Sequence, residues 1–287
     1  MTTYLKNTAC LCIFAYAAVL SIFSCTGKLN EKISVEDFSR KIDIETISKS
    51  RAYILPRPSA LGKLLSDAKF KYPALPAFNQ INDYKGTVKT AMNLGMRSAY
   101  GIYLLQAQPQ GSIPDEIGKT INDLAVRVGI RKHLENEFAA LDKARSTKDY
   151  KNISDNIDQI FINIELKLRQ EEMKELAVAV SLGGWIEGLN IITLGLTESF
   201  NAGTAQYVLC QSEIVQAYIV SLEDNFKDMT KKDPLLAPVY HTLKNKVLPE
   251  ILRLENKSAA ADEIKESVSR LTDSAKELKA LVEKQDA

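Results

Sequence analysis

The sequence predicts an all-α fold, a single multi-helix, bundle-like domain over residues 34–287. Apolar residues recur at intervals of three and four along most of the chain, and no series of alternating polar and apolar residues typical of strands occurs. About 260 residues after the N-terminal segment are enough to bury a sizeable core, as one large helical domain or as two packed bundles.

Two helices in the C-terminal part each have one apolar face. Asp233 and Pro234 favour the start of the first helix, and we expect Pro249 to kink it near its end. Its apolar face comprises Leu236, Tyr240, Leu243, Val247, Ile251 and Leu254. The apolar face of the second helix comprises Ile264, Val268, Leu271, Ala275, Leu278 and Val282. One such stripe is typical of a helix that packs on a core with one side.

Residues 176–196 form the most apolar internal stretch, and it is hydrophobic on almost every side. It predicts a central helix enclosed by its neighbours. A membrane-spanning helix is the alternative, but Glu187 lies within the stretch, and a charged residue near the middle of a bilayer costs at least a few kcal/mol.

Small residues at a spacing of four predict a close contact between two helices. Ala91, Gly95 and Ala99 share one helix face, and Gly184 and Gly188 share a face of the central helix. A glycine inside a helix costs about 1 kcal/mol relative to alanine. Close packing of the two ridges would offset that cost, and a glycine-lined ligand cavity is the alternative.

Residues 1–24 have the composition of a signal peptide. Lys6 precedes an apolar run over residues 9–23, which is short for a membrane span. The run ends in Ile22-Phe23-Ser24-Cys25, which resembles a lipobox, although the stricter motif has a small residue where Phe23 stands. We therefore expect cleavage before Cys25, lipidation of Cys25 with acyl chains such as palmitate, and a polar tether over residues 25–33. An uncleaved anchor or a buried helix is the alternative.

The charge balance argues against a nucleic-acid binder. Lys6 is the one charged residue among residues 1–24, so cleavage leaves 36 basic and 36 acidic residues. Nucleic-acid binding requires a basic excess or a basic stripe, and neither occurs. Of the four cysteines, Cys25 and Cys210 remain after cleavage, so we expect a packed core rather than a disulfide framework to stabilise the domain.

Three motifs give the chain a family resemblance. It has Asn-Leu-Gly at 93–95, Val-Gly-Ile at 128–130 and Gly-Trp-Ile-Glu-Gly at 184–188. In this order and spacing, over about residues 54–193, they resemble a family of helical lipoproteins of unknown function from Gram-negative bacteria. Tyr103 matches the family pattern, whereas Tyr100 stands where the family has an aspartate. The resemblance implies a helical fold and an envelope location, and it implies no established chemistry.

Motifs for metal, nucleophile or nucleotide chemistry do not occur. The two histidines, His133 and His241, belong to no Glu-x-x-His pattern, so we expect neither metal nor cofactor. Cys210 lies in an apolar run that predicts a core position, and no Gly-x-Ser-x-Gly or phosphate-binding loop is present.

Glu187 is the candidate site, because a carboxylate in an apolar helix needs a partner. Arg97 is the expected partner, since it lies on the helix with the other small-residue ridge. One interpretation is a structural ion pair. The other is a polar anchor in a ligand pocket lined by Trp185, Tyr100 and Tyr103.

Two classes of function remain. The first is a non-enzymatic envelope lipoprotein, exported and held by lipid on Cys25 at the outer membrane, which binds a protein partner or a small ligand. The second is an enzyme or ligand-binding protein that uses carboxylates in an interhelical cleft near Glu187. Such an enzyme requires at least two acids that converge on one cavity, and the sequence offers one.

Overall fold

The computed structural model describes residues 65, 68–74, 84–107, 115–147, several residues between 156 and 170, and residues 173–227, 229–256 and 258–284. These residues are 83% helical and contain no strand, which confirms the predicted all-α class. The predicted signal peptide, Cys25 and the tether lie outside the described residues.

The helices follow one another with short connections. They are α4 (Thr87–Ala107), α5 (Asp115–Val128), the 3₁₀ turn η3 (Arg131–His133), α6 (Glu135–Ser146), α8 (Lys174–Glu198), α9 (Ala202–Leu209), α10 (Ser212–Phe226), α11 (Met229–Lys232), α12 (Leu236–Thr242), the π turn η4 (Leu243–Val247), α13 (Leu248–Leu254) and α14 (Ala261–Glu283).

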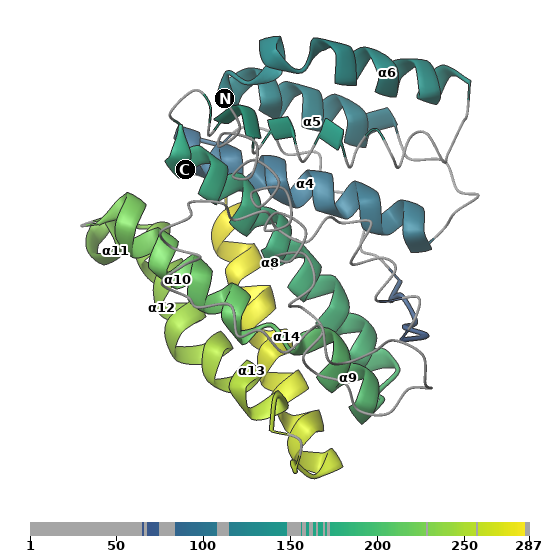
Figure 1. Ribbon diagram of the computed structural model, residues 1–287, viewed down its shortest axis with the longest axis vertical. Coiled ribbons are helices and arrows are strands. Elements are labelled where there is room, and N and C mark those ends of the chain that lie inside the picture. The colour runs from purple at the N-terminus through teal and green to yellow at the C-terminus, as the bar shows by residue number, and fades with distance from the viewer. Residues whose placement is uncertain are drawn as a thin grey trace, which may run out of the picture.

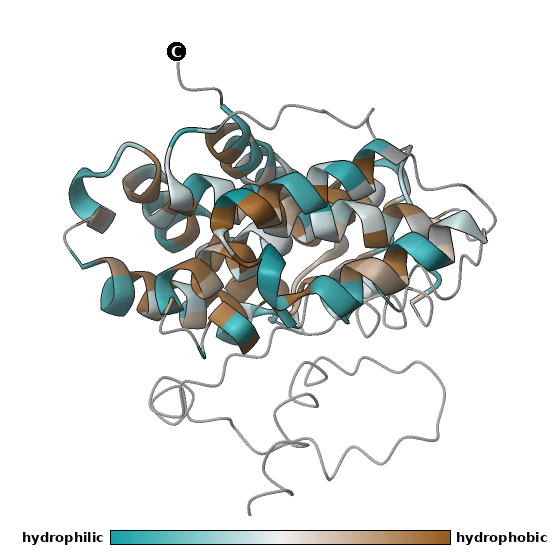
Figure 2. Ribbon diagram, turned by 90° about the horizontal axis from the view of Figure 1, so that it is seen from above, coloured by the Kyte–Doolittle hydropathy of each residue, from teal (hydrophilic) through white to brown (hydrophobic). Residues whose placement is uncertain are grey.

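Helix α8 lies at the centre of this arrangement (Figure 1). Helix α4 packs along one side of it, and α5 and α6 lie beyond α4. Helices α10 and α14 pack on α8 from other sides, and α13 packs on both of them. Hydrophobic residues gather where the helices meet, and hydrophilic residues cover much of the outer faces (Figure 2). The buried apolar side chains form one core cluster that runs from Leu65 to Val282.

The central helix is enclosed by the protein itself. Nearly every residue between Ala177 and Leu196 of α8 is buried. By length and composition α8 is able to cross a membrane, but 94% of its most apolar window is buried against other parts of the chain. This burial agrees with the prediction of a core helix.

Helices α4 and α8 approach so closely that backbone meets backbone. A methyl group on Gly95 would overlap the carbonyl oxygen of Val180 and lie 2.9 Å from the amide nitrogen of Gly184. A methyl group on Gly183 would overlap the carbonyl group of Met92. The predicted contact between the small-residue ridges is therefore correct on α4, whereas on α8 it is centred on residues 180–184. Gly188 instead makes room for the hydroxyl of Tyr103, 2.8 Å from the position of a Cβ.

Both predicted apolar faces in the C-terminal part are buried, apart from Tyr240, which is partly buried. Every residue of the α14 stripe is at most 3% exposed. In the preceding helix the carboxylate of Asp233 accepts hydrogen bonds from the backbone of Leu235 and Leu236, each at 2.8 Å. Pro249 follows η4, the wider turn in which Leu248 donates to Leu243. Because proline has no N–H to donate, the hydrogen-bond ladder changes around it, and a π turn is one such adjustment.

Candidate functional site

Glu187 forms an ion pair with a lysine of the C-terminal helix. It lies on the inner side of α8 and is 1% exposed. The ammonium of Lys279, from α14, donates to both of its carboxylate oxygens at 2.8 Å and 2.7 Å. Lys279 itself is 16% exposed. The pair therefore joins two helices that are far apart in the sequence, and its outer edge is close to solvent.

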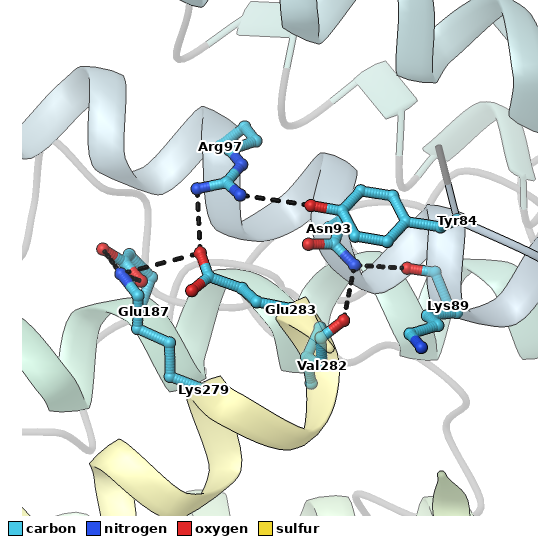
Figure 3. A network of polar contacts seen from close by, with 8 residues as sticks. All are labelled: Tyr84, Lys89, Asn93, Arg97, Glu187, Lys279, Val282 and Glu283. Atoms are coloured by element: carbon cyan, nitrogen blue, oxygen red, sulfur yellow. Dashed lines mark hydrogen bonds and ion pairs between the residues drawn. The ribbon is translucent and has the colours of Figure 1, made fainter. Parts of the chain in front are cut away.

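A second ion pair continues the network onto α4. The guanidinium of Arg97 lies 2.9 Å from a carboxylate oxygen of Glu283 and donates to the hydroxyl of Tyr84 at 3.2 Å. Lys279 lies 3.9 Å from that same oxygen of Glu283. Two acids and two cations thus alternate through the interface of α4, α8 and α14 (Figure 3).

Asn93 of α4 binds the C-terminal end of α14. Its amide nitrogen donates to the carbonyl oxygens of Lys89 and Val282, each at 2.9 Å. The Val282 carbonyl belongs to the last turn of α14, where helix geometry leaves such groups without a partner in the helix itself. The side-chain oxygen of Asn93 is buried and has no hydrogen-bond partner.

Burial is the largest influence on the acid–base behaviour of Glu187. It raises the pKa of this carboxyl above its ordinary value, while the ammonium of Lys279 and, more weakly, the guanidinium of Arg97 lower the pKa; the net direction is upward. The phenols of Tyr100 and Tyr103 are also buried, which raises their pKa values, and the charge of Glu187 raises them further. These two tyrosines therefore lie in the electrostatic neighbourhood of Glu187.

The expected partner of Glu187 needs a correction. Arg97 belongs to the same cluster and influences the pKa of Glu187, but its close ion pair is with Glu283, and Lys279 makes the bidentate contact to Glu187. Arg97 emerges from α4 across the interface, whereas Lys279 extends from α14 directly beside α8. The nearer cation neutralises the buried acid.

Trp185 does not belong to this cluster. Residues two positions apart project from nearly opposite sides of a helix, and Trp185 lies on the side of α8 that meets α10. Its indole nitrogen donates to Gln211 at 2.9 Å, and its ring lies 5.8 Å from that of Tyr218. Gln211 in turn donates to the carbonyl of Val208 at 2.7 Å. Trp185 therefore packs at the bend between α9 and α10, on a different side of α8 from Glu187.

Sequence reasoning missed Lys279 and Glu283, although a signal for them was present. Each residue directly follows a member of the α14 apolar stripe, Leu278 and Val282, and the two are four residues apart. Residues at this spacing share a helix face, so both are placed at the border of the buried stripe. A cation at that border is a natural partner for a buried acid elsewhere in the chain.

Among the described residues there is no group of three or more His, Cys, Asp or Glu side chains able to hold a metal ion. Cys210 is 9% exposed, as expected for a core position. It is also disulfide-bonded, whereas the sequence predicted a domain that is stabilised without a disulfide framework.

Searches against protein families, curated proteins and solved structures found no match for this chain. The resemblance to helical envelope lipoproteins therefore stays a prediction. What the cluster does follows from its own chemistry: its two carboxylates are charge-paired with two cations, an arrangement that fixes helices relative to one another.

Proposed function

We propose that the chain is an exported bacterial lipoprotein, held at the outer membrane through lipid on Cys25, whose helical domain acts as a non-enzymatic binding module. The observation that carries the anchoring is the N-terminal sequence: an acid-free apolar segment ends in the lipobox-like residues 22–25. A single acyl chain anchors a protein only marginally, whereas two or more chains hold it stably.

The geometry of the charged cluster supports the non-enzymatic part of the proposal. Both carboxylate oxygens of Glu187 accept hydrogen bonds from Lys279, and Glu283 forms an ion pair with Arg97. A general acid or base must exchange protons with a substrate, and neither carboxylate does so without first breaking an ion pair. Binding of a partner would then use the outer helix faces.

A carboxylate site for a small ligand or an enzymatic reaction is the second candidate. One observation favours it: Glu187 and Glu283 converge on the same ammonium, so two acids meet where the sequence offered one. Mass spectrometry of natively purified protein decides between the candidates. A bound small molecule that is lost in Glu187→Gln supports the second candidate, and co-purified protein without such a molecule supports the first.

Metabolic labelling with a fatty acid tests the anchor. We expect the wild type to incorporate label and Cys25→Ala to incorporate none, because the acyl chains attach to this residue. Cys12→Ala is the matched control: it changes a cysteine of the segment that is removed and should retain full labelling. Equal label on the wild type and Cys25→Ala would contradict the proposal.

A further inference from the structure

The last turn of α14 docks on α4 and α8 differently from the rest of that helix. Between Ile264 and Leu278, α14 buries an apolar stripe, with Thr272 the polar member that bonds to α8. Residues 279–283 add the charged contacts: Lys279 to Glu187 and Glu283 to Arg97, together with the Val282 carbonyl to Asn93. We name residues 279–283 the strap.

The surface under the strap is unusually polar for a helix interface. Asn93, Arg97 and Glu187 are between 0% and 3% exposed. Removing a charge from water costs several kcal/mol, so a buried ion pair gains little net free energy compared with an apolar contact of the same size. When the strap opens, these charged groups are hydrated again. Their hydration offsets much of the attraction that is lost between the paired charges. The orphaned oxygen of Asn93 would also gain a hydrogen bond to water.

The strap is already close to solvent along one edge. Lys279 is 16% exposed and Glu283 is 19% exposed. Val282 is its one fully buried apolar side chain, and Leu281 is partly buried. The charged side chains of the strap are therefore partly exposed without separation of the main core, and the apolar area that opening exposes is small.

From these contacts we infer that the strap is a hinged closure, which opens as a unit while the remainder of α14 stays docked and so uncovers Asn93, Arg97 and Glu187. Such local opening occurs where few apolar contacts hold an element and polar contacts regain water. The inference does not depend on lipid anchoring, because it rests on contacts within the helical domain.

Residue-resolved amide hydrogen exchange of the whole protein tests the inference. In the wild type, we expect the amides of residues 280–283 to exchange at one common rate, at least about 10-fold faster than those of residues 268–278. Simple fraying gives a different pattern, in which rates rise gradually from residue to residue toward the helix end. A graded pattern in the wild type would overturn the inference even if no variant folds.

Two variants sharpen the result. Lys279→Met removes the pair with Glu187 and should raise exchange of residues 280–283 together by about 10-fold or more, while the amides of residues 268–275 still exchange more slowly than the strap. Lys276→Met is the matched control, because Lys276 is an exposed lysine one turn earlier, and it should leave the strap within about 2-fold of the wild type. If the amides of residues 268–275 exchange as fast as those of the strap in Lys279→Met, the strap does not open independently.

Discussion

At the scale of single residues, the burial of Glu187 determines which partner matters most. Glu187 is 1% exposed, whereas Lys279 is 16% exposed and has Glu283 as a second acid 3.9 Å away. An uncompensated charge costs most where water cannot reach it. Loss of the lysine is therefore worse for this pair than loss of the acid.

We predict that Lys279→Met destabilises the protein at neutral pH by about 3–5 kcal/mol, the usual effect of leaving one charge of a buried pair alone. Glu187→Gln should lower the stability less, by about 1–3 kcal/mol, because Lys279 stays in contact with solvent and near the carboxylate of Glu283. Urea unfolding of both variants beside the wild type measures the difference. A gain of stability in Glu187→Gln would instead mark this carboxylate as functional, since functional groups are often unfavourable for the empty protein.

The stability of Lys279→Met should also depend on pH with a defined sign. Burial already raises the pKa of Glu187 in the folded wild type, and removing the lysine raises the folded pKa further. A group with a raised folded pKa contributes stability that is present at low pH and lost as the pH rises through that pKa. The stability that Lys279→Met loses relative to the wild type should therefore become smaller as the pH falls from 7 to 5. Thermal melts across this range test it, and a constant deficit would show that Glu187 stays ionised.

At the scale of helices, periodic patterns were predictable and pairings were not. The apolar stripes on α14 and on the segment from Leu236 to Leu254 are buried as predicted, except for the partly buried Tyr240, because a stripe faces a core whatever that core contains. The sequence did not predict that Glu187 pairs with Lys279 rather than with Arg97, because the pairing depends on which helix lies beside Glu187. The position of Trp185 was predictable in part: a spacing of two on a helix already separates it from Glu187.

The α4–α8 crossing gives a prediction at the same scale. Gly95→Ala should destabilise the protein by about 1–3 kcal/mol, the usual cost of overpacking, because the new methyl group meets the backbone of Val180 and cannot be accommodated by a change of rotamer. Gly203→Ala is the matched control. A Cβ at this exposed helical glycine meets only the Asn201 side chain at 3.5 Å, so alanine should be neutral or stabilising by up to about 1 kcal/mol. Thermal unfolding compares them, and equal melting temperatures would place the close contact elsewhere.

At the scale of the whole molecule, the buried apolar residues in the described part of the chain form one cluster, rather than the separate cores that two packed bundles would have. The cluster contains residues of α5 and α6, such as Leu124 and Phe138, together with residues of α13 and α14. Helix α8 connects the two sides, because α4 packs on one of its faces and α14 on another. The sequence predicted the central helix from its composition, but the continuity of the core depends on packing that a one-dimensional pattern does not contain.

A continuous core predicts cooperative unfolding, which the only tryptophan of the chain is able to report. Trp185 is 7% exposed and is hydrogen-bonded to Gln211 near α10, away from α5 and α6. Its emission should shift to longer wavelength when the α8–α10 interface opens, whereas far-ultraviolet circular dichroism follows every helix. If the domain is one cooperative unit, both signals change with the same urea midpoint and the same slope. Loss of part of the helical signal before the tryptophan shift would show that α5 and α6 unfold separately, and that the shared core around α4 does not couple the two sides.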